Sequence, residues 1–154
     1  MDTLVKEMEI KRLAPEDLSV FSELTGLFTN VFETGKTVTA DDKYLMTLLN
    51  NPDFVAIAIV CRNQVVGGAT GYRLPMYISK SAELFIYDVA VDPAYQRQGL
   101  GTKLLTALKE YCQQNDIELM FVPANEEDVH ALNFYQATGG QGEKVVQFSY
   151  NTLT

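Results

Sequence analysis

The chain of 154 residues is poor in cysteine and has no long apolar run. Its two cysteines, Cys61 and Cys112, stand far apart, so neither has a partner at the spacing of a redox or zinc pair. No stretch approaches the roughly 20 consecutive apolar residues of a membrane span, and the first residues lack a signal peptide's apolar segment. We therefore expect a cytoplasmic protein with no membrane contact, no metal site and two buried, free thiols.

Basic residues are also scarce. Lysine and arginine together number 12 against 20 acidic residues, which gives a formal net charge of -8. Such a chain is a poor partner for nucleic acid or an anionic membrane, because both repel negative charge. Cationic ligands suit it better, although an acidic surface is also an ordinary way to keep a protein soluble.

The sequence contains no repeat, no low-complexity segment and no linker, and 47% of its residues are hydrophobic. These features predict one domain over residues 1–154 with a single core. Apolar periodicity and turn residues predict strands over 4–13, 54–60, 65–70, 83–91, 117–122 and 144–150, and helices over 15–31, 41–50, 100–113 and 127–137. The order β-α-α-β-β-β-α-β-α-β indicates an α/β fold with a mixed central sheet flanked by helices.

Two glycines, Gly99 and Gly101, lie where the strand over 83–91 gives way to a helix, between the cations Arg97 and Lys103. The first N–H groups of a helix lack partners and carry the positive end of its dipole, so this junction is suited to an anion such as phosphate. A tight turn with ordinary glycines is the alternative. The spacing fits neither a P-loop nor a dinucleotide-binding fingerprint.

The pattern that does fit is Gln96-x-x-Gly99-x-Gly101. It resembles the acetyl-CoA motif [QR]-x-x-G-x-[GA] of the GNAT superfamily of N-acetyltransferases, and the predicted order of elements resembles that family over nearly the whole chain. Residues 83–91, 97–105 and 131–135 are similar to the class I aminoglycoside 3-N-acetyltransferases, which are small members of the superfamily.

The resemblance implies that the pyrophosphate of acetyl-CoA lies on the loop over 98–102 and that pantetheine runs along the strand over 89–91. A splayed strand would offer unpaired N–H and C=O groups there, and a β-bulge could aim one N–H at the thioester oxygen. The expected cofactor-binding residues are Val89, Ala90, Val91, Gln96, Arg97, Gln98, Gly99, Leu100, Gly101, Thr102, Lys103 and Asn133.

Acetyl transfer to an amine needs a group that accepts the amine's proton. Asp88 is the first candidate, because a carboxylate inside an apolar run needs a partner or a purpose, and it matches a carboxylate in the Tyr-Asp-Leu-Ala-Val stretch of the aminoglycoside group. A satisfied structural carboxylate that caps a loop or pairs with an arginine is the alternative. Glu83, near the start of the same strand, is the second candidate and a substrate-binding residue.

Tyr135 is the candidate acid for the departing thiolate, since the superfamily usually carries a tyrosine near the CoA sulfur and a phenol stays protonated at neutral pH. Its helical spacing with Val129 and Leu132 equally fits a core aromatic. The only histidine, His130, is interpreted as an exposed helix residue, and no cysteine lies near the motif, so we expect direct transfer in a ternary complex.

The sequence therefore predicts an acetyl-CoA-dependent N-acetyltransferase acting on a polycationic small amine, with the 3-amino group of an aminoglycoside antibiotic as the leading acceptor. Glu126, Glu127 and Asp128 are candidates for binding that cation, although acids there also favour a helix dipole. A polyamine, a small metabolite or a protein N-terminus remains an alternative acceptor, and a CoA-binding module without turnover an alternative function. The family resemblance suggests a homodimer, formed through the last strand or its neighbours.

Overall fold

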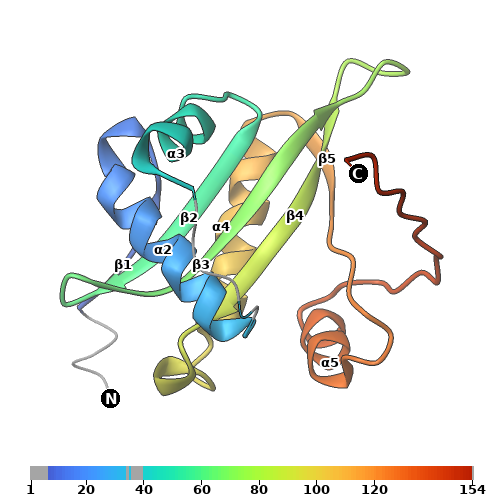
Figure 1. Ribbon diagram of the computed structural model, residues 1–154. Helices are drawn as coiled ribbons and strands as arrows, with labels where there is room; N and C mark the ends of the chain where they lie inside the picture. Colours follow the sequence, from blue (N-terminus) through green and yellow to red (C-terminus); the bar gives the residue numbers. More distant parts are fainter. Residues whose placement is uncertain (1–6, 34, 36–39, 154) are drawn as a thin grey trace. The chain divides into compact units, whose positions relative to one another are not determined.

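A computed structural model of the chain describes residues 7–33, 35 and 40–153. The chain forms two compact units, Met1–Pro123 and Ala124–Thr154, and each is described by itself. The first unit carries the sheet and most of the helices, and the second carries the helix α5 (Figure 1).

The first unit is built on one mixed sheet. Its strands are β1 (Met8–Arg12), β2 (Phe54–Cys61), β3 (Gln64–Pro75), β4 (Ala82–Val91) and β5 (Ile117–Phe121), in the order β1-β2-β3-β4-β5. The first four pair antiparallel, whereas β5 runs parallel to β4. The mixed sheet confirms the predicted fold class. The strand predicted over 4–13 is shorter than expected where the structure describes it, and residues 4–6 lie outside the described part.

Helices cover both faces of this sheet (Figure 1). They are the short helix η1 (Pro15–Asp17), α2 (Leu18–Val31), α3 (Asp42–Leu49), the short helix η2 (Pro93–Tyr95) and α4 (Leu100–Gln114). α2 and α3 lie on one face and α4 on the other. The inner face of α4 is apolar and consists of the buried residues Leu100, Leu104, Leu105, Leu108 and Tyr111.

The hairpin between β2 and β3 turns on Arg62 and Asn63, both with positive φ, at 50° and 64°. Two successive residues of this kind form the type of turn whose twist matches that of the flanking strands. Gln64 follows this turn and begins β3, one residue before the strand predicted over 65–70. Cys61, at the end of β2, and Cys112 on α4 are both buried and free, as predicted.

Asp17 fixes the start of α2. Its side chain is only 8% exposed, and one oxygen lies 2.8 Å from the Lys11 ammonium while the other accepts the backbone N–H of Ala14 at 2.9 Å. The bond to Lys11, followed by the bond from Ala14, lowers the pKa of the Asp17 carboxyl. Asp17 thereby joins the start of α2 to β1 through the ion pair with Lys11.

α2 packs directly on the backbone of β3 at Gly68. A Cβ on that residue would lie 2.3 Å from a methyl group of Leu24 and 2.7 Å from the carbonyl oxygen of Ile57. A second tie links the same two elements, because the Glu23 carboxylate accepts the backbone N–H of Val65 at 3.0 Å. These contacts hold α2 flat against the face of the sheet that it covers.

The second unit contains α5 (Val129–Ala137), which begins two residues later than predicted. The final strand predicted over 144–150 is wrong, since the structure describes no strand there. Alternating Val, Phe and Tyr favour an extended strand, but a strand forms only where a neighbour pairs with its backbone. The large apolar side chains of this segment are instead exposed: Val145, Val146, Phe148 and Tyr150.

Candidate active site

A β-bulge interrupts β4 at Tyr87. Neighbouring residues of β3, Thr70 and Gly71, pair with Asp88 and Ile86, so Tyr87 has no opposite residue on that side. One extra residue in a strand reverses the alternation of side chains beyond it. The bulge therefore decides which face of the sheet each later residue of β4 occupies.

The consequence is largest for Asp88. Regular alternation would place it on the same face as Leu84 and Ile86, two fully buried residues on the face that α4 covers. The register instead places Asp88 opposite Thr70, on the face of α2 and α3, directly after Tyr87 on the same face. The extra residue takes the carboxylate out of the apolar layer under α4 and puts it on the opposite face of the sheet.

Asp88 is half-buried. Among the described residues, no side chain bonds to its carboxylate or pairs with it, and burial alone raises its pKa above the ordinary range of a carboxyl. The arginine-paired structural carboxylate, considered as an alternative, is thus not what this part of the chain shows. Glu83 occupies the same face of β4 but lies five residues earlier, roughly 15 Å along the strand.

Aromatic rings surround this position. Tyr72 on β3 meets Tyr87 edge to face, with ring centroids 5.8 Å apart and an angle of 81° between the planes. Burial, and then the neighbouring Tyr87, Tyr44 and Asp88, raise the pKa of the Tyr72 phenol. These tyrosines were not predicted as site residues, because only the cross-strand register and the bulge bring them together.

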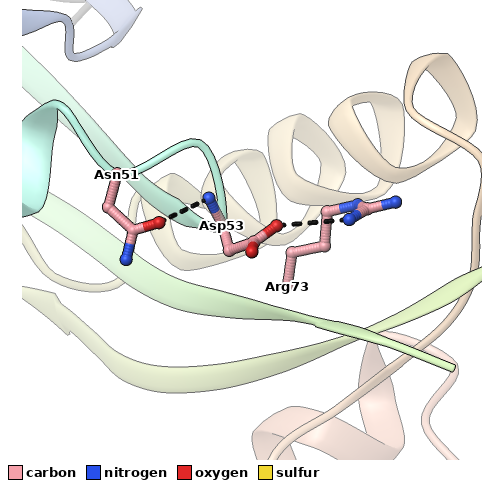
Figure 2. A network of polar contacts seen from close by, with 3 residues as sticks. All are labelled: Asn51, Asp53 and Arg73. Carbon is pink, nitrogen blue, oxygen red and sulfur yellow. Dashed lines mark hydrogen bonds and ion pairs between the residues drawn. The ribbon is translucent and has the colours of Figure 1, made fainter.

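A polar clamp holds the strand next to Tyr72. The side chain of Arg73 lies 3.2 Å from the Asp53 carboxylate, and its backbone N–H donates to the Asp53 carbonyl at 2.7 Å. The N–H of Asp53 in turn donates to the side-chain oxygen of Asn51 at 2.9 Å, as Figure 2 shows. The clamp fixes the loop between α3 and β2 to β3 and so positions the aromatic layer.

Beyond the bulge, one edge of β4 is open. Its pairing with β5 covers Ala82 to Phe85 and goes no further. From Ile86 to Val91, no other strand in the described ranges pairs with β4 on that side. This stretch presents backbone N–H and C=O groups to whatever lies beside it.

The glycine junction follows at the end of β4. Arg97 and Gly99 both have left-handed backbones, with φ of 62° and 79°, and Gly99 is the N-cap of α4. Open space surrounds the position of a Gly99 Cβ. Gln96, predicted to bind the cofactor, uses its side-chain amide to donate to the Val91 carbonyl at 3.0 Å, so it ties the loop to the strand.

Residues 19–139 match the acetyltransferase (GNAT) family. The chain belongs to the GNAT family. Its bulged β4, the open edge beyond the bulge and the glycine-capped α4 are the features through which a GNAT sequence was expected to hold acetyl-CoA. The residues present fit that molecule, because no described strand pairs with β4 beyond Phe85 on the side of β5, and a helix N-terminus with an exposed Arg97 follows.

Two solved structures of soil metagenomic enzymes are similar to this GNAT chain over almost its full length. The aminoglycoside acetyltransferase meta-AAC0020, in complex with sisomicin, is 38% identical, with a TM-score of 0.92 over 98% of this chain and 99% of that one. The aminoglycoside acetyltransferase HMB0005 is 28% identical, with a TM-score of 0.87 over 95% and 99%.

A curated relative matches a shorter part. The [ribosomal protein bS18]-alanine N-acetyltransferase of Haemophilus ducreyi is 35% identical over 57 residues. The match covers 37% of this GNAT chain and 39% of that relative, so the chain spans about two fifths of its length.

The second unit carries the remaining predicted residues of this GNAT chain. Asp128 caps α5 by accepting the N–H of Ala131 at 3.0 Å, which is the helix-terminal role considered for it, and Glu126 forms an exposed ion pair with Lys144 at 3.4 Å. Tyr135 lies on α5 with its ring 5.2 Å from that of Phe134. Asn133 and Glu127 are exposed.

Two hollows in the first unit lie away from Asp88. A hollow of about 410 Å³ lies between β1 and α4, and includes Thr102 and Lys103 from the glycine junction. A second, of about 260 Å³, lies beside the loop that leads into β2. The candidate site is an open strand edge with a carboxylate beside it, and neither of these two hollows includes that carboxylate.

The part of the chain that the structure describes contains neither a metal-binding cluster nor a membrane-spanning helix. In that part of the chain, no three His, Cys, Asp or Glu side chains gather in a way that suits a metal ion. Among the helices it contains, none has both the length and the apolar character needed to cross a membrane.

Proposed function

We propose that this chain is an acetyl-CoA-dependent N-acetyltransferase whose acceptor is a polycationic small amine, and specifically the 3-amino group of an aminoglycoside antibiotic. The observation that carries the proposal is the half-buried carboxylate of Asp88, which has no partner among the described residues and which the bulge places at the start of the open edge of β4. The similarity to meta-AAC0020, which was solved with sisomicin, supports the choice of acceptor. Modification of such an antibiotic would confer resistance.

The cofactor has a place in each element after the bulge. The pantetheine arm would lie along Val89, Ala90 and Val91 and would pair with those of their backbone groups that point to the open edge, and the N–H groups over residues 98–102 would hold the pyrophosphate. Arg97 and Lys103 add positive charge beside it. Acetyl-CoA supplies the activated acetyl group, and no metal is needed in this scheme.

Asp88 serves as the base. The acceptor amine reacts only as the neutral form, so a group beside it must take up its proton. Burial raises the pKa of the Asp88 carboxyl, which makes it a better proton acceptor than an exposed carboxylate. The amine then attacks the thioester directly, without an acetylated side chain of the enzyme.

The second unit supplies the other proposed residues. Tyr135 donates a proton to the departing thiolate, and Asn133 contacts the cofactor. Glu83 in the first unit and Glu126, Glu127 and Asp128 in the second attract the cationic acceptor, in keeping with the formal net charge of -8. We further propose a cytoplasmic homodimer.

A second acceptor is favoured by one specific observation. The 35% identity to a bS18-alanine N-acetyltransferase, over 57 residues, favours the N-terminal amine of a protein. A peptide beginning with alanine therefore belongs in the same test as the antibiotic.

Thiol release from acetyl-CoA tests the proposal, with sisomicin, spermidine and an N-terminal alanine peptide as acceptors. We expect turnover with sisomicin that falls about 10²- to 10⁴-fold in Asp88→Asn, the usual effect of losing a general base. Asp116→Asn is the matched control, since Asp116 is exposed and asparagine tolerates its positive φ of 54°.

The outcomes separate the alternatives. Turnover with spermidine or the peptide alone would retain the reaction and reject the antibiotic as acceptor. Binding of acetyl-CoA without turnover on any amine would favour a CoA-binding module. A Tyr135→Phe variant with unchanged kcat would remove the proposed acid from the mechanism.

A further inference from the structure

Two tyrosine rings form a right-angled corner beside Asp88. Tyr72 and Tyr87 meet at 81°, and Asp88 follows Tyr87 on the same face of the sheet. The Tyr87 side chain is 61% exposed, whereas Tyr72 is half-buried. A large exposed ring next to a carboxylate with no partner in the described part of the chain is unusual for a position that only packs.

Neighbouring rings hold this corner in place. Phe54 packs against Tyr72 from β2, with centroids 5.3 Å apart. Phe85, directly opposite Tyr72 in the register, meets Tyr87 edge to face at 5.8 Å and stacks on Phe121 of β5. Each tyrosine is thus supported from behind, so its orientation is set before any ligand arrives.

The faces of these rings attract positive charge. An aromatic ring carries negative charge density on its face, and an ammonium over that face is attracted to it. Within the described residues, the only cation over a ring is Arg12, which lies over Tyr111 on the far side of the sheet. No cation in the described ranges lies over Tyr72 or Tyr87, and the Asp88 carboxylate adds negative charge beside them.

We propose that Tyr72 and Tyr87 bind a second, protonated amine of the acceptor while Asp88 faces the neighbouring amine that reacts. This inference rests on the proposed function, and it explains how the enzyme would select its acceptor. The reacting amine must be neutral, whereas the aromatic corner stabilises a charged one, so the two sites have separate occupants. Acceptors with two or more amines are therefore preferred over monoamines.

Calorimetric binding of sisomicin and steady-state kinetics test the inference with three variants. Tyr87→Leu removes the ring, Tyr87→Phe keeps it, and Tyr77→Leu is the control, since Tyr77 is 97% exposed between β3 and β4. We expect Tyr87→Leu to raise the dissociation constant and the KM for sisomicin about tenfold, as loss of one such contact predicts. Tyr87→Phe and Tyr77→Leu should stay within about twofold, and the KM for acetyl-CoA should not change.

A monoamine acceptor, glucosamine, provides a further test. Tyr87→Leu should not weaken its use, because it has no second amine. The inference is overturned if Tyr87→Leu binds sisomicin like the wild type, if Tyr87→Phe is as weak as Tyr87→Leu, or if glucosamine is affected equally.

Failure of the proposed function has a different signature. Binding of sisomicin that depends on the Tyr87 ring, without any acetyl transfer, would retain the aromatic site and reject the enzyme activity. Acetyl transfer by a wild type that does not discriminate between sisomicin and glucosamine would retain the enzyme activity and reject the aromatic site.

Discussion

Replacing Asp88 by asparagine should stabilise the protein while it abolishes most of the activity. The carboxylate is half-buried and lacks a partner in the described part of the chain, so the folded state keeps a charge that water would solvate better. An unsatisfied, fully buried polar group costs about 1–3 kcal/mol, and residual solvent roughly halves that at Asp88. The expected gain is therefore about 1 kcal/mol, or roughly 2–4 °C in Tm.

The gain should depend on pH with a definite sign. Burial raises the pKa of Asp88 in the folded state, so folding favours the protonated form. The charged form destabilises the fold above the folded-state pKa, and this cost disappears as the pH falls below the unfolded value of about 3.9. The difference between Asp88→Asn and the wild type should accordingly be largest near pH 8 and smallest near pH 4.

Urea unfolding of both proteins between pH 4 and 8 measures this difference. Because one charge is removed elsewhere in Asp116→Asn, that variant controls for the change in net charge. A lower stability of Asp88→Asn than of the wild type at pH 8 would refute the reasoning, since it would mean that the carboxylate is satisfied. A pH-independent difference would refute it equally.

Three further substitutions test the scaffold. Gly68→Ala should lower the free energy of unfolding by about 1–3 kcal/mol, because the added methyl group overpacks against Leu24. Gly26→Ala, with open space around it in α2, should raise the free energy of unfolding by about 0.5–1 kcal/mol. Thermal unfolding should therefore show a lower Tm for the first variant and a higher Tm for the second. Gly99→Ala should cost about 1–2 kcal/mol through its left-handed backbone alone, and no shift in Tm would contradict that. Asp17→Asn should cost about 1 kcal/mol at pH 7, and because its folded pKa is lowered, the difference should vanish as the pH falls through that pKa.

Local pattern was enough to predict most of the fold. α4 was predictable because its apolar residues recur at helical spacing and its glycine cap precedes them, and the residues that recur in this way are buried. The hairpin at Arg62 was predictable because a short polar turn separates two apolar strands. Each of these signals lies within one stretch of chain.

The last predicted strand shows the limit of such signals. Residues 144–150 have a strand's composition, but a strand exists only through a partner, and pairing is not written in the segment itself. The element most dependent on distant residues is the one that sequence reasoning misassigned.

In the candidate site, likewise, some residues could be predicted from the sequence and others could not. Asp88 stood out as a charge in an apolar run, and the glycine junction stood out by its motif. Tyr72 and Tyr87 did not, because regular alternation predicts no contact between Tyr87 and the face that Asp88 occupies. A bulge depends on which residues of β3 face β4, so its position could not be predicted from β4 alone.

The open stretch of β4 has a consequence for how this chain can vary. Main-chain N–H and C=O groups are the same for every residue except proline, so exchanging the side chains of Val89 or Val91 leaves the row of donors and acceptors intact. Substitutions at these positions therefore leave the binding of any ligand that pairs with the backbone unchanged. A proline removes a backbone N–H donor, and the insertion or deletion of one residue shifts the register, so only these changes alter the pattern of donors and acceptors on the strand.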